Sequence, residues 1–573
     1  MRRTLRAASP VLGLLLLVAC AGGPDEAHDD APAGPPVAET LLPETVATTL
    51  RVGLSRDPRS LDPRSVSDDE GELVVRALFD GLVDLSPDGG IVAAGAERWI
   101  VEDDGRTYRF ILRESRFHDG TDVTAQHHAD ALLAVFDQDR MPLFREELLA
   151  SLNGARNDAV PGARDESDEA DPEGAAVPRW GTAAEVVEAG GIEVVSDREL
   201  VLRLERADAL LLHRLTDPVL APLPAVATTD PEGFAREPVG NGPFRMAGPR
   251  EPGSFVRLRA NDDHHAPPRV DELVLQIYAD DADRSQRWAD LLAGRLQVAA
   301  VPVERRDEAR ERFGSPVASR VGSGLHEVTV ASSYAYGFVI DVAPYDDVDL
   351  RRAMSAAIDR EGIAVELSAA GVEPADAILP PSLGGETPSC AHCRHDPELA
   401  RELAAVWRER AGDAAEDVRI VLSYPRGGGH VTVAERIASD LEGTLGLEVR
   451  LQSREFGTLV RSIVAGDAPM FRYGLRAPLG GEAAGVALLE SALRTGAGEN
   501  WVRWADPATD AALDAWAPGA SPDLVRGIES EVLEAAAIVP LLWTRQDLAV
   551  DPSVVGFRID VTGRWWPERV RLR

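Results

Sequence analysis

Two cysteines and two histidines fall within the short segment Cys390-Ala-His-Cys-Arg-His395. Such a cluster could close a local disulfide, bind zinc, form a thioredoxin-like redox pair or attach haem. A haem site needs histidine directly after the second cysteine, where Arg394 stands. Zinc ligands this close along the chain would be strained, and no compact βαβ pattern surrounds the pair. A disulfide between Cys390 and Cys393 is the favoured interpretation, with zinc and redox roles left open.

Other segments place histidines beside residues that could assist chemistry. His127-His128 and His264-His265 could bind a metal ion, but adjacent histidines on a helix point about 100° apart, which favours surface positions. His118-Asp-Gly120 could be a catalytic or metal pair, and a turn with glycine at positive φ explains it equally well. Gly427-Gly-Gly-His430 lacks the Lys-Ser/Thr of a phosphate-binding P-loop. We therefore expect no metal site.

The sequence lacks common signatures of a secreted hydrolase. It contains neither a Gly-x-Ser-x-Gly elbow, which presents a nucleophilic serine, nor a His-Glu-x-x-His helix, which binds zinc. We therefore expect no enzymatic activity and no cofactor.

The N-terminal segment has the pattern of an export signal. It begins with Arg2, Arg3 and Arg6, continues through the apolar stretch 11–18 and ends at Leu17-Val-Ala-Cys20. The apolar stretch is shorter than the ~20 residues that span a bilayer. Its end resembles the bacterial lipobox, in which the cysteine is acylated. We expect a lipoprotein signal peptide at 1–19 and an extracytoplasmic protein anchored to the cell membrane by acylated Cys20, with an ordinary signal peptide as the alternative.

Composition points to a tethered, acidic protein. Residues 20–48 are rich in alanine, proline, glycine and acids, which predicts a flexible acidic tether. The formal net charge is −36, and all 60 basic residues are arginine. Strong negative charge disfavours binding to nucleic acid and to anionic lipid surfaces. Whether the acidity attracts cationic ligands or reflects salt adaptation stays open.

The body of the chain alternates predicted strands with predicted helices. Residues 49–573 exceed what one hydrophobic core usually organises, so two or three domains are expected. Strands are predicted at 50–54, 107–112, 192–204 (two strands joined by residues 196–198), 418–423 and 447–451. Helices are predicted at 72–83, 124–136, 349–358, 397–410, 433–445 and 524–537, with Thr124 as an N-cap. The acidic stretch 157–176 is rich in structure-breaking residues and predicts a mobile surface insertion.

Several motifs occur in the order that one protein family shows. They are Ser60-Leu-Asp-Pro63 after the first strand, Leu78-Phe-Asp-Gly-Leu-Val83, Trp99 to Phe110, Phe117-His-Asp-Gly-Thr-Asp-Val-Thr-Ala125, Val239-Gly-Asn-Gly-Pro-Phe244, Tyr345 to Met354 with Ala357-Ile-Asp-Arg360, and His395-Asp-Pro-Glu-Leu-Ala400. With this set the chain resembles the extracytoplasmic solute-binding proteins of ABC importers, family 5, the cluster of oligopeptide-, dipeptide- and nickel-binding members. The Phe117–Ala125 stretch is the most diagnostic match.

The resemblance implies an α/β protein with a two-lobed, periplasmic-binding-protein type II-like fold and an extra subdomain in lobe I. Lobe I would span 49–325, with its subdomain at about 89–225 and the insertion 157–176 inside it. Lobe II would span 326–540, and 541–573 would return to lobe I. The ligand would lie in the cleft between the lobes and favour a closed state.

The resemblance also implies where ligand contacts lie. In peptide-binding relatives, the loop corresponding to residues 56–63 lies along the ligand, and an aspartate in the stretch corresponding to residues 472–482 pairs with the peptide's α-ammonium group. This chain has no aspartate between Tyr473 and Gly481. Arg472 and Arg476 favour an anionic group, or a sugar packed on Trp501, and arginines that are solvated or paired with surface acids explain the pattern equally well. The candidate ligand-binding residues are Asp57, Arg59, Tyr336, Tyr424, Arg426, His430, Arg472, Arg476 and Trp501.

The expected partners follow from the same resemblance. They are a small-molecule or peptide ligand, the permease and ATPase subunits of an ABC importer, and the membrane through the lipid anchor, with no nucleic acid and a monomeric chain. An oligopeptide is the default ligand. The alternatives are a non-peptide solute such as an oligosaccharide or metal chelate, and a ligand-sensing receptor without transport.

Overall fold

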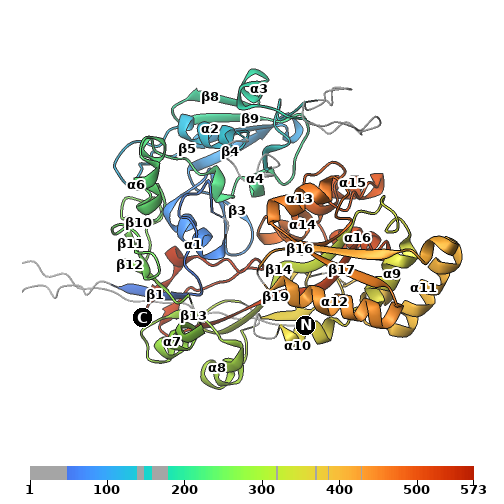
Figure 1. Cartoon of the computed structure of the whole chain (residues 1–573). Helices are drawn as coiled ribbons and strands as arrows, with labels where there is room; N and C mark the ends of the chain where they lie inside the picture. Colours follow the sequence, from blue (N-terminus) through green and yellow to red (C-terminus); the bar gives the residue numbers. More distant parts are fainter. Residues whose placement is uncertain are drawn as a thin grey trace, which may run out of the picture. The chain divides into compact units, whose positions relative to one another are not determined.

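A computed structural model describes residues 48–573, except 67, 138–147, 158–178, 280, 318–319, 368–370, 385 and 428 (Figure 1). Cys20, the proposed tether and nearly all of the acidic insertion 157–176 therefore lie outside the described residues. Within the described part, no helix combines the length and the apolar character that crossing a membrane requires.

An eleven-stranded sheet runs through the described chain in the order β10-β11-β12-β1-β13-β19-β14-β18-β16-β17, with β15 paired to β19. Strand β1 is parallel to β12 and β13, and β16 is parallel to β17 and β18, whereas β14 and β19 are antiparallel to each other. The bounds are β1 (Thr49–Leu54), β10 (Phe244–Met246), β11 (Phe255–Ala260), β12 (Glu272–Ile277), β13 (Val298–Ala300), β14 (Gly324–Phe338), β15 (Val372–Pro374), β16 (Arg419–Pro425), β17 (Glu448–Arg454), β18 (Met470–Arg476) and β19 (Ile538–Val550).

Two long strands join separate hydrophobic cores. In β14, Val328 and Val330 belong to the core built on β1, β11 and β12, whereas Tyr336 and Phe338 belong to the core built on β16. Strand β19 connects the same two cores in the opposite direction: Val539 belongs to the core built on β16, and Leu548 belongs to the core built on β1. Their pairing is irregular between Thr329 and Ser333, where the chain passes from one core to the other. These two strands are therefore continuous connections between the cores.

Helices cover the sheet on the side of each core. Helix α1 (Asp69–Leu78) buries Val74, Val75 and Leu78 in the β1 core, and its N-cap Asp68 accepts a hydrogen bond from the Gly71 N–H. Helices α9 (Val348–Ala357), α11 (Pro397–Ala411) and α12 (His430–Leu445) pack beside β16 and β17 (Figure 1). The other helices are α7 (Asp281–Leu292), α8 (Arg306–Phe313), α10 (Arg360–Glu366), α13 (Phe456–Val464), α14 (Ala484–Leu493), α15 (Pro507–Asp514) and α16 (Pro522–Glu534).

A second, four-stranded sheet has its own core. Its order is β4-β5-β9-β8, formed by β4 (Ala96–Glu102), β5 (Thr107–Leu112), β9 (Glu199–Arg203) and β8 (Ile192–Ser196). Helix α2 (Ala125–Ala134) packs on it through Ala125, Ala129 and Leu132. The short elements around both sheets are β2 (Val83–Leu85), β3 (Ile91–Ala93), β6 (Arg156–Asn157), β7 (Arg179–Trp180), α3 (Ala183–Glu188), α4 (Leu211–Arg214), α5 (Val226–Thr229), α6 (Pro231–Arg236), β20 (Val554–Val555) and β21 (Arg571–Leu572).

Two local predictions from the sequence are wrong. The helix predicted at 72–83 ends at Leu78, because Phe79 turns to extended backbone and Val83 already begins β2. His128 is not on the surface: it is 1 % exposed on the inner face of α2, while its neighbour His127 accepts a hydrogen bond from the Thr124 N–H at the N-cap. By contrast, Gly120 does adopt φ +89° in a turn, and Asp119 accepts the Thr121 N–H, as the turn interpretation predicts.

Candidate functional site

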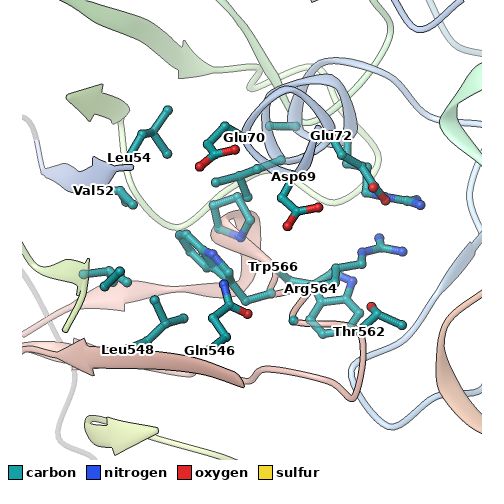
Figure 2. A pocket seen from close by; sticks show the side chains of 18 of the residues that line it. Val52, Leu54, Asp69, Glu70, Glu72, Gln546, Leu548, Thr562, Arg564 and Trp566 are labelled. Carbon is teal, nitrogen blue, oxygen red and sulfur yellow. The ribbon is translucent and has the colours of Figure 1, made fainter. Parts of the chain in front are cut away.

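A cavity of about 1000 Å³ lies where the β1 core and the strands β14 and β19 meet. Its walls come from the end of β1, from α1, from β19 and from the C-terminal segment 562–569. Figure 2 shows Val52, Leu54, Glu70, Gln546 and Leu548 around it. This volume is at the upper end of the ~300–1,000 Å³ that ligand pockets typically have.

The first turn of α1 brings acidic side chains to the cavity. Asp69, Glu70 and Glu72 all line it, and acidic residues are favourable at a helix N-terminus because the backbone N–H groups there carry partial positive charge (Figure 2). Burial raises the pKa of Glu70 although Arg56 lies 3.3 Å away. Burial also opposes ionisation of Glu72, but Arg76 and Arg476 outweigh it and lower the pKa of Glu72 to about 2.

Ion pairs form the boundary between this cavity and a second one of about 440 Å³. Glu72, Arg76, Arg476 and Arg564 line both cavities. Arg76 pairs with Glu72 at 2.7 Å, Arg476 of β18 pairs with Asp69, and Arg564 pairs with Asp84 at 2.8 Å. Arg76 of α1 itself, Arg476 of β18 and Arg564 near the C-terminus thus hold the acids of α1 and β2.

Arg287 of α7 is a buried cation on the cavity wall. It is 4 % exposed, its Nη1 donates to the Ser55 hydroxyl at 2.8 Å, and its Nε has no hydrogen-bond partner. Among the described residues, no carboxylate forms an ion pair with it. Burial lowers the pKa of Arg287 and the neighbouring Arg284 lowers it further, whereas the carboxylate of Glu70, which forms no ion pair with it, acts in the opposite direction. A buried guanidinium without a directly bonded carboxylate is costly, so this position favours an anionic group in the cavity.

Glu568 is a further titratable group on the wall. Burial raises its pKa to about 7, with the nearby Asp84 acting in the same direction. The cavity therefore combines an unpaired cation near β1 and α7 with a carboxyl group that is partly protonated at neutral pH.

The nine candidate ligand residues from the sequence lie in several places. Arg476 is the one among them that lines the cavity. Asp57 accepts hydrogen bonds from Arg250 at 2.5 Å and from the Gly253 N–H at 2.8 Å. Arg59 is exposed, and its backbone N–H donates to Asp68.

Four candidates gather around a residue that was not on the list, Tyr334. The Tyr334 hydroxyl lies 3.0 Å from His430 Nδ1, and the Arg472 guanidinium lies 4.5 Å from the centre of its ring. The Tyr336 ring lies 6.2 Å from that of Tyr334, and Tyr424 packs in the same core. Burial and Arg472 together lower the pKa of His430 to about 4.

The last two candidates are further along the chain. Arg426 is exposed, and its backbone N–H donates to the Arg454 carbonyl. The Trp501 ring stacks on Tyr473 at 5.3 Å, and its indole N–H donates to the Gly498 carbonyl. Ligand binding by any of the nine stays a prediction.

The cysteine cluster is a disulfide in this structure. Cys390 and Cys393 are bonded to each other, and the Nε2–H of His392 between them donates to the Leu533 carbonyl at 2.8 Å. Both sulfurs lie in the core beneath α14 and α16.

Sequence reasoning missed Arg287, Glu568 and Asp80, and it favoured surface positions for His264 and His265, although the His264 side chain is only 7% exposed. The histidine pair was noticed, but its segment was compared with a helix. The backbone there is a turn between β11 and β12, and the two rings lie side by side with centres 4.2 Å apart. Burial, which makes Arg287 unusual, is set by tertiary packing and leaves no local signal.

Comparison with known proteins agrees with this architecture. The family model for bacterial extracellular solute-binding proteins, family 5 Middle, matches residues 90–489. The oligopeptide-binding protein OppA of Bacillus subtilis is 22% identical over 445 residues, which is 74% of each chain. Among solved structures, Haemophilus influenzae OppA in complex with RPPGFSPFR has a TM-score of 0.66 at 19% identity, covering 92% of this chain and 99% of that one. The PBP AgaA of A. tumefaciens R10 in complex with agropinic acid has a TM-score of 0.66 at 21% identity, covering 92% and 99%.

The fold and its ligand-sized cavity define a two-lobed α/β binding protein, as the sequence predicted. The chain belongs to the bacterial extracellular solute-binding proteins of family 5.

Proposed function

We propose that the protein captures a peptide through an anionic group, most simply the C-terminal carboxylate, and delivers it to an ABC importer. The observation that carries this proposal is Arg287, a buried guanidinium on the cavity wall with Ser55 as its hydrogen-bond partner. A carboxylate placed there would supply the direct ion-pair partner that Arg287 lacks among the described residues. Related proteins named for oligopeptide binding support a peptide as the solute.

The domain arrangement in this proposal follows the sequence interpretation. Lobe I comprises 49–325 with its subdomain at about 89–225, lobe II comprises 326–540, and 541–573 returns to lobe I. The passage of β14 and β19 between two cores near residues 331 and 543 supports these boundaries. Acylation of Cys20 would keep the monomeric protein at the membrane, near the permease and ATPase subunits that it serves.

A carboxylate-bearing solute that is not a peptide is the second candidate. Arg287 and Ser55 would accept its carboxylate in the same way, and the similar protein AgaA is known in complex with agropinic acid. The two candidates differ in the remainder of the solute that the cavity must hold. The calorimetric titration described next separates them.

The proposal is tested by calorimetric titration of the Arg287→Met variant with short peptides that carry either a free C-terminal carboxylate or a C-terminal amide. The wild type should bind the free acid at least about tenfold more tightly than the amide, a difference near 1.4 kcal/mol. In Arg287→Met this preference should vanish, because the guanidinium that would pair with the peptide carboxylate is gone. The melting temperature without ligand should stay equal or rise, because an unpaired buried charge has been removed.

Arg116→Met is the matched control, because the Arg116 side chain is 73% exposed and pairs only with the similarly exposed Asp122 among the described residues. It should retain the preference for the free acid. An acid-over-amide preference that survives in Arg287→Met would refute the assignment of Arg287. Binding of carboxylate-bearing non-peptides without any peptide binding would replace the first candidate by the second.

A further inference from the structure

Asp80, His264 and His265 meet on the wall of the large cavity, from segments far apart in the sequence. Asp80 follows α1, and the two histidines lie in the turn between β11 and β12. The backbone of Asp80 is fixed by the buried Asn241, which accepts its N–H and donates to its carbonyl, each at 3.0 Å. The backbone that carries the Asp80 carboxylate is therefore held in place independently of the histidines.

The three side chains aim potential ligand atoms at one position. His264 Nε2 lies 2.7 Å from Asp80 Oδ2, and His265 Nδ1 lies 3.8 Å from the same oxygen. One ligand atom from each residue lies within 4.8 Å of the other two. A single ion with bonds of about 2.0–2.2 Å to nitrogen and oxygen bridges atoms spaced in this way after small side-chain movements.

The surroundings favour metal binding over a simple ion pair. His264 Nδ1 lies 3.0 Å from the Ala266 carbonyl, an outer contact of the kind that orients metal-binding histidines. An ion pair between Asp80 and His264 would leave His265 unexplained. Its ring nitrogens make no hydrogen bond within the described residues, although its side chain is only 30% exposed.

We propose that Asp80, His264 and His265 bind one divalent transition-metal ion on the wall of the cavity. Two imidazoles and one carboxylate suit zinc and its neighbours in the first transition series, and three protein ligands leave at least one coordination position open. Because all three residues line the cavity, the open position is available to a donor atom inside it. If the proposed solute binding holds, an amine or carboxylate of that solute completes the coordination.

The test is a calorimetric titration of the full-length, EDTA-treated protein with Zn²⁺, without any solute. One Zn²⁺ ion should bind per chain, and His265→Ala should weaken binding by at least about tenfold while leaving the metal-free melting temperature unchanged. His265 is the informative position because it holds no other described residue by a hydrogen bond. Asp80→Asn should weaken Zn²⁺ binding as well.

The cysteine cluster supplies the matched control, since Cys390, His392 and Cys393 are the other group whose geometry could hold a metal among the described residues. A double variant, Cys390→Ser with Cys393→Ser, should bind Zn²⁺ as the wild type does. No saturable binding, or binding that survives His265→Ala and disappears in the double cysteine variant, would overturn the proposal. Since no solute is present, this outcome is independent of whether the peptide proposal holds.

Discussion

At the scale of single residues, the cavity is distinguished by titratable groups whose pKa is shifted by burial. Arg476 could be singled out from the sequence because it lies in a stretch with family precedent. Arg287 and Glu568 could not, because nothing local to an arginine in a charged helix or a glutamate after a proline reveals how deeply it is buried. Residue types were predictable, whereas their environments depend on the packing of segments hundreds of positions apart.

Glu568 gives the clearest pH dependence. Its pKa in the folded protein, about 7, lies above the ordinary value of 4.5, so the folded state holds this proton more tightly than the unfolded state does. Its contribution to stability is therefore greatest below pH 4.5 and is lost as pH rises through 7. Glu568→Gln should raise the melting temperature at pH 8 and leave it unchanged at pH 4.5.

The control for this comparison is Glu114→Gln, whose side chain is 86% exposed. It should shift the melting temperature little at either pH. A Glu568→Gln protein that is equally or less stable than the wild type at pH 8 would show that Glu568 is ionised without penalty in the folded state.

At the scale of elements, hydrophobic periodicity and capping residues predicted most helices to within a few residues. Pro397 at the start of α11 and Thr124 before α2 mark boundaries that the structure reproduces. The end of α1 was misplaced because the apolar pattern continues into β2 after the backbone has become extended. The contacts between α4 and α14 could not be foreseen, because ion pairing between distant helices leaves no periodic signal.

Those contacts form a second set of buried ion pairs. Arg214 of α4 pairs with Asp208 at 2.6 Å and with Glu490 of α14, and the side chains of all three are at most 16% exposed. Arg494 holds Glu490 from the other side at 2.9 Å. In the proposed lobe arrangement, Arg214 belongs to the subdomain of lobe I and Glu490 to lobe II, so this pair must separate when the lobes open.

We predict that Glu490→Gln favours the open state of the protein without ligand. Removing one charge leaves Arg214 paired with Asp208 alone, which weakens the link to α14. Small-angle scattering should give a larger radius of gyration for Glu490→Gln than for the wild type at low salt. Glu448→Gln should leave the radius unchanged, because the Glu448 side chain is 68% exposed and pairs with the similarly exposed Arg419 within the proposed lobe II. An unchanged radius of gyration together with a lowered melting temperature would contradict the prediction. It would show that Glu490 stabilises the fold without controlling the opening of the lobes.

At the scale of the whole molecule, the family resemblance predicted the fold, because its motifs lie in register along most of the chain. The central sheet is shared by two cores through β14 and β19, so these strands are where relative movement of the cores must be accommodated. The cavity lies beside them, which places a bound solute where it can influence that movement. The solute itself could not be predicted, since the aspartate that the family resemblance leads us to expect is absent between Tyr473 and Gly481.

The central claim, that the large cavity carries a solute through Arg287, is tested most directly by native mass spectrometry of the protein purified from its own host without refolding. The wild type should show additional masses that fragment into amino-acid residues, and Arg287→Met should show them at much lower occupancy. A wild-type protein that carries no additional mass, and gains none after incubation with a mixture of short peptides, would contradict the account.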